Sequence, residues 1–434
     1  MDPYYELAYA LESKSLCLFV GTGFSMHLSD EKAPSWIGLL KECAKKLDDG
    51  EELCKQLFPN SSPIMPLEEC ASIIQVKMHY HGLCLHSEIA KIIDKVKLGK
   101  NAKVTKDFVN KFLDLKFVTT NYDRLIDREL LKEEDRTTYG GGFPINRQPR
   151  GVQIYHIHGS VKYPKKMVVT ADDYFRFINS PDYFSNKVQT LIEENTTVII
   201  GYSLGDVNFK SILNKFRMNR HHDINRQNLF FLSRKKVDKH VRDYYDRSYG
   251  LRVIDETSVD DFFNNVSEKH ESIKGRVNKS RDLLFPVLEK KKKFTDVYLK
   301  KKESFFEIVA TLSSNAVLVS HPDVIQFLKD ILQRKNNFTN EDGAWSQYEH
   351  LASWLVHLGC IMDISSTPLR DTYLDAVEKS FKNMSKRKVL GRSWDAFWAW
   401  KNGWFNLTYE NRFMISQHFD RDERSEDMNE VMNQ

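Results

Sequence analysis

The sequence predicts an α/β protein with a doubly wound, mostly parallel Rossmann-like sheet, followed by a mainly α-helical region. Two observations carry this prediction. Up to about residue 275, short runs rich in β-branched and aromatic residues recur, with helical patterns between them. After that point the apolar residues follow helical spacing instead. We therefore expect an α/β domain over residues 1–275 and a helical domain over residues 276–434.

Most of the predicted strands are continuously apolar, which is typical of strands buried on both faces of a parallel sheet. In such a sheet, ligands bind beyond the carboxyl ends of the strands. Asp206 is expected to begin one of the intervening helices, with Phe209, Ile212, Leu213 and Phe216 on its buried face. In chain order, the predicted strands are 16–20, 116–120, 152–158, 167–170, 196–203, 228–233 and 251–255.

Two regions outside the predicted sheet are helical in pattern. Residues 35–112 contain several amphipathic segments and few strand patterns, which predicts a helical insertion after the first strand and helix. In the C-terminal region, Pro322 occupies a first-turn position before an apolar-periodic segment. The aromatic residues of the stretch 394–405 fall near helical spacing, so they fit either the core of a second domain or an interface.

The composition argues against several classes of protein. No apolar stretch approaches the ~20 residues that span a bilayer, and the first residues lack the basic and apolar regions of a signal peptide, so a cytoplasmic protein is expected. The net charge of +4 is small for 434 residues, and direct nucleic-acid binding is not indicated. The six cysteines form no C-x-x-C pair, so neither a zinc site nor a disulfide framework is expected.

A pair of glycines ends the first predicted strand, in the segment LCLFVGTGFSMHL. Gly21 and Gly23 would let backbone N–H groups approach a diphosphate without a Cβ in the way, and Ser25 adds a hydroxyl donor. The segment lacks the third glycine of the dinucleotide-binding fingerprint, so the pair also fits a purely structural turn.

Three further stretches carry polar residues at the ends of predicted strands. They are TTNYD with Thr120, Asn121 and Asp123, HIHGS with His158, and GYSLGD with Gly201 and Ser203. Each has a structural interpretation as well, because Asn and Asp often form turns or helix caps and a histidine can be a core residue. The carboxyl ends of parallel strands meet at one edge of a sheet. The order of these three stretches and the glycine pair along the chain therefore favours a common site.

Read in chain order, GTGFS, TNYD, HGS and GYS resemble the sirtuin-type NAD-binding domain, which carries a G-A-G-x-S loop, a Q-N-x-D segment, an H-G pair and a G-T-S turn. The resemblance covers about residues 1–270. It implies cleavage of the nicotinamide N-glycosidic bond of NAD, with Asn121 orienting the ribose or the attacking water. Asp123 would engage the carboxamide, and His158 would be the base near the ribose hydroxyls. The residues implied to hold NAD are Gly21, Thr22, Gly23, Ser25, Thr120, Gly201 and Ser203.

The sequence also departs from the sirtuins that remove acyl groups from peptides. Those enzymes have a zinc ribbon with two C-x-x-C pairs, a proline-phenylalanine-arginine stretch after the glycine loop, and a Gln before the Asn. Here MHLSDEKAPSW follows Ser25, and Thr120 precedes Asn121. The remaining pattern is similar to the sirtuin-like effector domains of bacterial antiphage systems, which hydrolyse NAD.

Three functions follow from this resemblance. An NAD glycohydrolase is favoured, a non-catalytic NAD-binding scaffold is the alternative, and the missing cysteines oppose a protein deacylase. Among the defence effectors, the chain length and helical tail are similar to the group encoded with a HerA-type ATPase. That similarity implies a homo-oligomer and a ring ATPase as partner. No metal is expected in the reaction, because nicotinamide is already a good leaving group.

Overall fold

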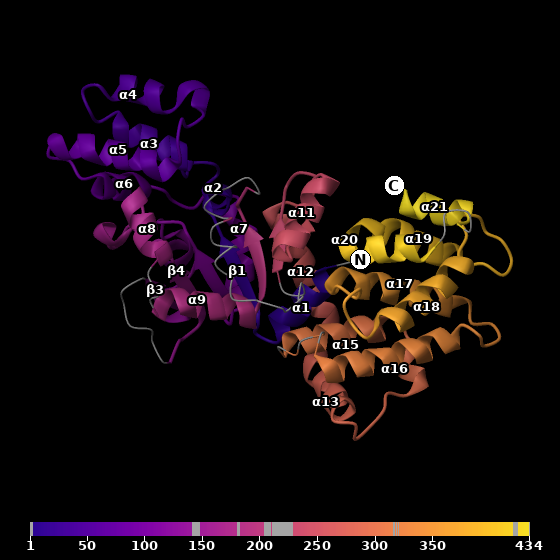
Figure 1. The fold of residues 1–434 in the computed structure, drawn as a ribbon. Coiled ribbons are helices and arrows are strands. Elements are labelled where there is room, and N and C mark those ends of the chain that lie inside the picture. The colour runs from indigo at the N-terminus through magenta and orange to yellow at the C-terminus, as the bar shows by residue number, and fades with distance from the viewer. Residues whose placement is uncertain are drawn as a thin grey trace.

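The computed structural model describes residues 3–140, 148–179, 183–203, 210, 229–315, 317, 319, 321–419 and 424–433. The helix that we expected to begin at Asp206 lies outside these residues. A seven-stranded, all-parallel sheet forms one part of the described fold, and a group of packed helices forms the other (Figure 1). This is the α/β architecture followed by a helical region that the sequence predicts.

The sheet has the strand order β3-β4-β2-β1-β5-β6-β7. β1 lies in the centre and pairs with β2 on one side and with β5 on the other. Strands β2 to β4 therefore lie on one side of β1, and the later strands β5 to β7 lie on the other side. That change of direction is where ligands bind in doubly wound sheets. The strands are β1 (Leu16–Val20), β2 (Lys116–Thr119), β3 (Arg136–Gly140), β4 (Val152–His156), β5 (Thr196–Ile200), β6 (Leu229–Leu232) and β7 (Arg252–Ile254).

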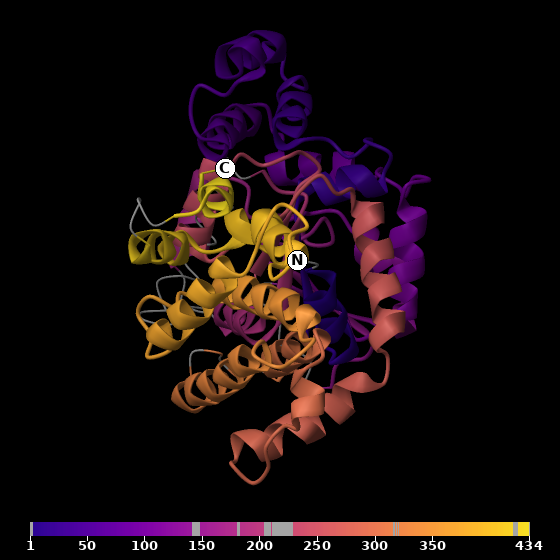
Figure 2. The same cartoon turned by 90° about the vertical axis from the view of Figure 1, so that its right-hand side faces the viewer.

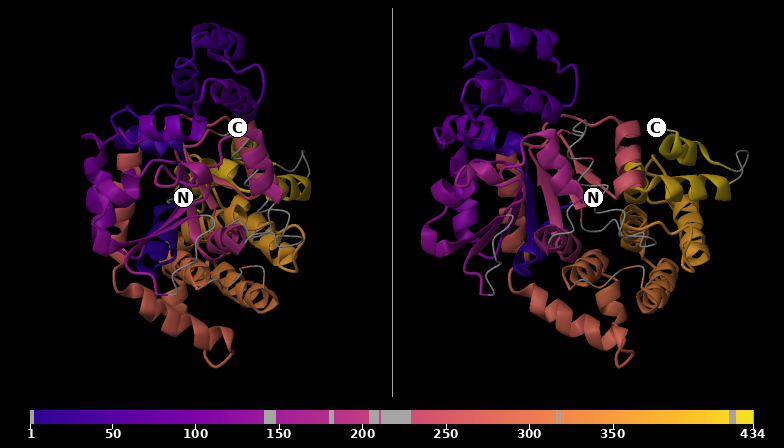
Figure 3. Two further views of the ribbon diagram at one scale, coloured as in Figure 1. Left: turned by 90° about the vertical axis from the view of Figure 1, so that its left-hand side faces the viewer. Right: turned by 60° about the vertical axis from the view of Figure 1, so that its left-hand side comes forward.

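Both faces of the sheet are buried, which explains the continuous apolar runs. Along β1, Leu18 and Val20 belong to one core cluster, whereas Cys17 and Phe19 belong to another. The first face packs against α1 (Tyr4–Glu12), α7 (Ala102–Lys111) and α12 (Val259–Ile273), and the second against α9 (Tyr183–Glu194) and α11 (Lys239–Tyr249) (Figures 1 and 3).

The expected insertion after β1, which the structure describes throughout, consists of helices joined by loops and contains no strand. Helix α2 (Thr22–Leu28) leads out of the sheet into it. Helices α3 to α6 have a hydrophobic core of their own and stand above the end of the sheet, away from most of the C-terminal helices (Figures 1 and 2). They are α3 (Trp36–Ala44), α4 (Gly50–Leu57), α5 (Leu67–Tyr80) and α6 (Leu85–Ile93).

Two strand predictions differ from the structure. Residues 167–170 form no strand; Met167 and Val169 are apolar because they pack against the core of the insertion. Strand β3 was not predicted, because RTTYG is a polar, half-exposed edge strand without an apolar run. The segment between β2 and β3 includes a π-helix, η2 (Leu125–Leu130), and α8 (Ala171–Asn179) follows β4.

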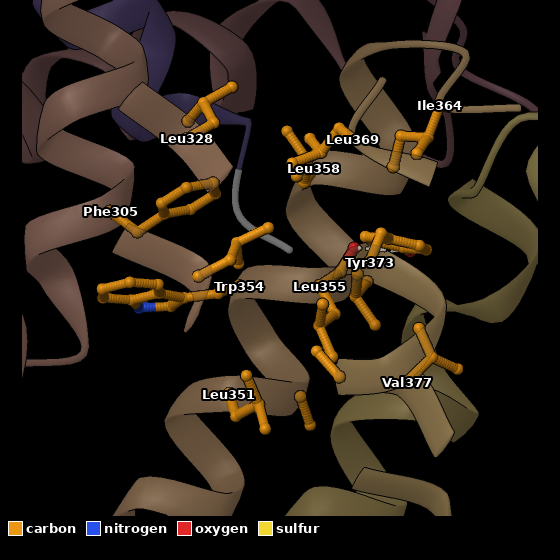
Figure 4. Packing of buried hydrophobic residues seen from close by; sticks show 14 of the residues in the cluster. Phe305, Leu328, Leu351, Trp354, Leu355, Leu358, Ile364, Leu369, Tyr373 and Val377 are labelled. Atoms are coloured by element: carbon orange, nitrogen blue, oxygen red, sulfur yellow. Dashed lines mark hydrogen bonds between the residues drawn. The ribbon is translucent and has the colours of Figure 1, made fainter. Parts of the chain in front are cut away.

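The C-terminal helices enclose one continuous hydrophobic core, which is centred on α17 (Figure 4). The rings of Phe305 and Trp354 stack at 4.9 Å, and the hydroxyl of Tyr373 donates to the carbonyl of Leu355 at 2.9 Å. In the part of the chain that the structure describes, no helix has the length and apolarity to cross a bilayer. The helices are α13 (Arg276–Leu288), α14 (Asp296–Leu299), α15 (Glu303–Ser314), α16 (Pro322–Phe338), α17 (Trp345–Ile361), α18 (Arg370–Lys382), α19 (Trp394–Gly403), α20 (Tyr409–His418) and α21 (Glu426–Met432).

Helix α1 connects the sheet with the C-terminal helices. One of its sides packs on α12, while Ala8 and Tyr9 share a small core with Ala310 of α15. Its Glu6 is buried and accepts two hydrogen bonds from Arg252 of β7, at 2.8 and 2.9 Å. A charged pair that is both bidentate and buried holds α1 in one position on the sheet.

Candidate functional site

The four polar stretches of the sequence meet in one cavity at the carboxyl edge of the sheet. The cavity has a volume of about 470 Å³ and lies between the strand ends and the helical insertion. Of the predicted site residues, eight line it: Thr22, Ser25, Thr120, Asn121, Asp123, His158, Gly201 and Ser203. Gly21 and Gly23 lie in the same loop but are not part of the wall.

Asn121 is tied to the glycine loop by its side-chain amide. Its Nδ2 group donates to the carbonyl of Gly21 at 2.8 Å and to Oγ of Ser25 at 2.7 Å. Both amide hydrogens are therefore used within the protein. The carbonyl oxygen Oδ1 accepts no hydrogen bond from the described residues, so it is the atom of Asn121 that is available to a ligand.

Asp123 lies beside this amide and completes a chain of hydrogen bonds. The Ser25 hydroxyl donates to Oδ2 of Asp123 at 2.6 Å, and the N–H of Leu125 donates to Oδ1 at 3.1 Å. Burial raises the pKa of Asp123, and the bond from Ser25 offsets this only in part. The carboxyl group is thus an acceptor held in place at the cavity wall.

His158 approaches the cavity from the turn after β4. Its ring makes edge contacts with Tyr174 and Phe177 of α8, at centroid distances of 5.3 and 5.0 Å. Burial lowers the pKa of His158 to about 3, so the imidazole is neutral at physiological pH. Its Nε2 has no hydrogen-bond partner among the residues that the structure describes.

From their positions at strand ends, Asn121 and His158 are expected to lie outside the core, and this expectation is wrong. They are only 8% and 3% exposed, respectively. The reason is that the insertion covers the edge of the sheet, so strand ends that would face solvent in a bare sheet line a cavity beneath the insertion instead. Substitutions at either residue therefore need a control for stability.

A buried network of polar side chains lies behind Asn121 and was not predicted from the sequence. His156 Nδ1 lies 3.2 Å from the backbone oxygen of Asn121 and donates to it, which leaves Nε2 facing Oδ1 of Asp127 at 3.8 Å. Arg124 donates twice to the other oxygen of Asp127, at 2.6 and 2.8 Å. Burial opposes ionisation, but the contacts with His156 and Arg124 outweigh it and lower the pKa of Asp127.

His156 and His158 have different surroundings although they are only two residues apart. Alternation places His156 and His158 on the same face, but β4 ends at His156 and residues 157–158 form a turn. The side chain of His156 contacts Asp127, whereas only His158 lines the cavity. The one sequence signal for this network was a second carboxylate, four residues after Asp123 and within η2.

The glycines serve close contacts between the ends of β1 and β5. A Cβ on Gly21 would meet the ring of Tyr202 at 2.6 Å, and one on Gly201, whose φ is +78°, would meet the Phe24 backbone nitrogen at 2.2 Å. The N–H groups of Gly21 and Gly23 donate to the carbonyls of Ile200 and Gly201, both at 2.9 Å. These two amides are thus engaged inside the protein, unlike the free diphosphate donors that the sequence suggested.

The insertion supplies an apolar wall opposite the polar strand ends. Trp36, Leu39, Leu67 and Ile93 line the cavity on this side. Trp36 packs against Tyr122 with ring centroids 5.8 Å apart. A polar floor with an apolar wall suits a ligand that has both hydrogen-bonding groups and a flat ring. No group of three or more metal-ligating side chains occurs within the described ranges.

Comparisons with known proteins agree with the resemblance to sirtuins. Residues 115–254 match the model of the SIR2-like domain, which covers the strands from β2 to β7. The chain is 22% identical over 253 residues to an NAD(+) hydrolase ThsA from Cytobacillus dafuensis, covering 56% of this chain and 46% of that protein. It is 24% identical over 260 residues to the defense-associated sirtuin 2 of Bacillus subtilis, covering 59% of this chain and 24% of that protein.

A third relative is the NAD(+) hydrolase ThsA of Acinetobacter baumannii strain 532279, at 22% identity over 251 residues, 56% of this chain and 47% of that protein. The chain thus spans between about a quarter and a half of the length of these relatives. The similarity supports a SIR2-like domain. It does not distinguish the group that is paired with a HerA-type ATPase, which stays a prediction.

Proposed function

We propose that this chain is an NAD glycohydrolase, which cleaves NAD and water into nicotinamide and ADP-ribose. In this reaction the bond between the ribose C1 carbon and the nicotinamide nitrogen breaks, and its electron pair goes to nicotinamide. A bond from a water oxygen to C1 forms, and that water loses a proton to solvent. The observation that carries the proposal is the fixed amide of Asn121, whose Oδ1 is left for a ligand in the cavity at the strand ends.

Each polar side chain of the cavity has a role in this proposal. Oδ1 of Asn121 accepts a hydrogen bond from the attacking water or from a ribose hydroxyl and so orients it. The carboxyl group of Asp123 accepts from the amide N–H of nicotinamide. His158, as a neutral imidazole, contacts the ribose hydroxyls by hydrogen bonding. Its low pKa makes it a weak base as it stands, so we assign it an orienting role first.

The apolar wall supports hydrolysis in a second way. Departure of nicotinamide leaves an oxocarbenium-like sugar, and a dry pocket with one oriented water prevents competing reactions. Trp36, Tyr122 and Leu67 supply flat and aliphatic surface of this kind. NAD enters the proposal as the substrate, and none of these steps requires a metal.

Product analysis separates the three candidate functions. Purified full-length chain is incubated with NAD, with and without an acetyl-lysine peptide, and nicotinamide is measured. The hydrolase proposal predicts nicotinamide and ADP-ribose at the same rate in both samples. Nicotinamide release that depends on the peptide would indicate a deacylase, and tight NAD binding without release would indicate a scaffold.

The protonation state of His158 gives a test that does not depend on activity. Because burial lowers its pKa to about 3, the ring NMR signals of His158 are expected to stay constant between about pH 5 and 8. The signals are assigned by their loss in His158→Gln. A titration midpoint near the ordinary histidine value of about 6.5 would contradict a desolvated, neutral imidazole.

We further propose that the chain is a cytoplasmic antiphage effector that depletes NAD, and that its C-terminal helices build a homo-oligomer and dock a ring ATPase of the HerA type. One relative named above is a defense-associated sirtuin, which supports the defence role. The aromatic stretch 394–405 divides into two sets. Phe397, Trp400 and Trp404 are buried in the core, whereas Trp394 is 37% exposed.

This division sharpens the test of assembly. Trp394→Ala is expected to reduce the mass of the native particle without lowering its unfolding temperature, because the ring covers little of the core. Trp400→Ala is the control for packing and is expected to lower the unfolding temperature, since that ring is fully buried. An unchanged mass for Trp394→Ala in light scattering would remove Trp394 from the proposed interface.

A further inference from the structure

A second cavity lies where α1 meets the C-terminal helices, and it shares no wall residue with the cavity at the strand ends. Its volume is about 510 Å³, which is within the range of sites for small molecules. Its walls come from five helices that are far apart in the sequence: α1, α12, α15, α17 and α19. The proposed reaction uses none of them.

Two buried polar side chains in this wall lack partners. His357 of α17 is 1% exposed, and within the described part of the chain neither of its ring nitrogens has a hydrogen-bond partner. The nearest carboxylate oxygen, on Glu6, lies 4.0 Å from Nε2, beyond hydrogen-bond range. The buried hydroxyl of Tyr5 is also unpartnered among these residues. Buried polar atoms in native proteins are usually hydrogen-bonded, so His357 and Tyr5 can accept hydrogen bonds from a ligand in this cavity.

The charges around the cavity favour a cationic ligand. Arg252 neutralises Glu6, and Lys302 forms an ion pair with Glu349. Two more wall carboxylates, those of Glu303 and Asp395, form no ion pair with any described residue, and both are exposed. Among the wall residues that the structure describes, Lys269 is the remaining cation, so outside these two pairs the described wall has one more carboxylate than cation.

An aromatic ring at the wall completes the arrangement. Trp398 of α19 is 39% exposed and lines the cavity, and an exposed indole face attracts cations. Burial lowers the pKa of His357 to about 4, so the imidazole is neutral at physiological pH. A neutral imidazole offers a lone pair to an N–H donor and does not repel a cation.

We propose that this cavity binds a small organic cation, a primary amine or guanidinium on an aliphatic body. One N–H group of the cation donates to the lone-pair nitrogen of His357 and another donates to the oxygen of Tyr5. Glu303 and Asp395 balance the charge of the cation, and Trp398 contacts it by a cation–π interaction. The bound cation joins α1 to α15, α17 and α19. It therefore stabilises the contact between the sheet and the C-terminal helices.

The experiment uses agmatine, which carries both a guanidinium and an amine, with glutarate as an anion of similar length. Binding to the full-length chain is measured by calorimetry, and the unfolding temperature is measured with each compound. We expect one agmatine per chain, a higher unfolding temperature with agmatine, and no binding of glutarate. His357→Phe and Trp398→Ala are each expected to weaken binding at least about tenfold, which is about 1.4 kcal/mol.

Trp345→Ala is the matched control, because Trp345 is an exposed tryptophan of α17 that lies outside the cavity. The Trp345→Ala variant should bind agmatine with the affinity of the parent chain. If His357→Phe does not fold, the double variant Glu303→Gln with Asp395→Asn is used instead. The same loss of agmatine affinity is expected for it. No agmatine binding up to about 10 mM would overturn the proposal. So would equal binding of glutarate, or agmatine binding that all these variants retain.

Discussion

Replacing Asn121 with alanine is expected to lower kcat/KM for NAD cleavage about 10²-fold or more. The substitution removes Oδ1, the acceptor that we assign to the water or ribose. It also removes the donor that joins the carbonyl of Gly21 to the hydroxyl of Ser25. Steady-state release of nicotinamide at several NAD concentrations measures the effect. A variant that keeps close to the parent kcat/KM would remove Asn121 from the mechanism.

Because Asn121 is buried, a loss of activity has to be separated from a loss of stability. Asn195 provides a matched control at the other end of β5. It is also buried, and its Nδ2 donates to the carbonyl of Leu191 at 2.6 Å while Oδ1 accepts from Lys116 at 2.9 Å. Asn195→Ala is expected to lower the unfolding temperature but to leave kcat/KM unchanged. An equal loss of kcat/KM in both variants would mean that stability explains the effect.

Replacing Arg252 with alanine is expected to lower the free energy of unfolding by about 3–5 kcal/mol. Without Arg252, the buried carboxylate of Glu6 loses two hydrogen bonds and its charge partner. Arg252 also lies over the ring of Phe230, at 4.5 Å from its centroid. Urea unfolding measures the change. A loss below about 1 kcal/mol, as for a surface pair, would contradict this account of how α1 is held.

Two further variants test the cause of that loss. Arg247→Ala removes an exposed arginine paired with Glu410 and is expected to cost less than about 1 kcal/mol. The double variant Glu6→Gln with Arg252→Met leaves no charge unpaired, so it should be more stable than Arg252→Ala. The same instability in the double variant and in Arg252→Ala would assign the effect to packing.

The ion pair of Glu6 and Arg252 also predicts that the free energy of unfolding depends on pH. Burial would raise the pKa of Glu6, but Arg252 outweighs it, and the net pKa is below the ordinary value of 4.5. Because the pKa is lower in the folded chain, the unfolded chain binds more protons in this range. The stabilisation is therefore fully present above about pH 5 and is lost as the pH falls through the folded pKa.

Much of the sheet could be predicted because a buried parallel strand leaves a local signal. The apolar runs at 16–20 and 196–203 contain β1 and β5, which pair in the centre of the sheet. Edge strand β3 has no such run, so its sequence resembles that of a loop. Residues 167–170 have a strand-like sequence for another reason, since their apolar side chains fill the core of the insertion.

The candidate site was predictable to the extent that topology brings strand ends together. Thr120, Asn121 and Asp123 follow β2, and Gly201 follows β5. Both strands pair in parallel with β1, so their carboxyl ends lie at the same edge of the sheet. Contacts across different elements were not predictable in this way. The packing of Tyr202 on Gly21, the contact of His156 with Asp127 and the wall supplied by the insertion all depend on three-dimensional packing.

The central claim is that the cavity at the strand ends hydrolyses NAD. Proton NMR of NAD mixed with the purified full-length chain tests it most directly, because it follows substrate and both products in one sample. We predict that NAD disappears while nicotinamide and ADP-ribose appear in equal amounts, and that Asn121→Ala leaves NAD intact under the same conditions. NAD that stays intact with the parent chain, or that Asn121→Ala consumes at the parent rate, would contradict the claim.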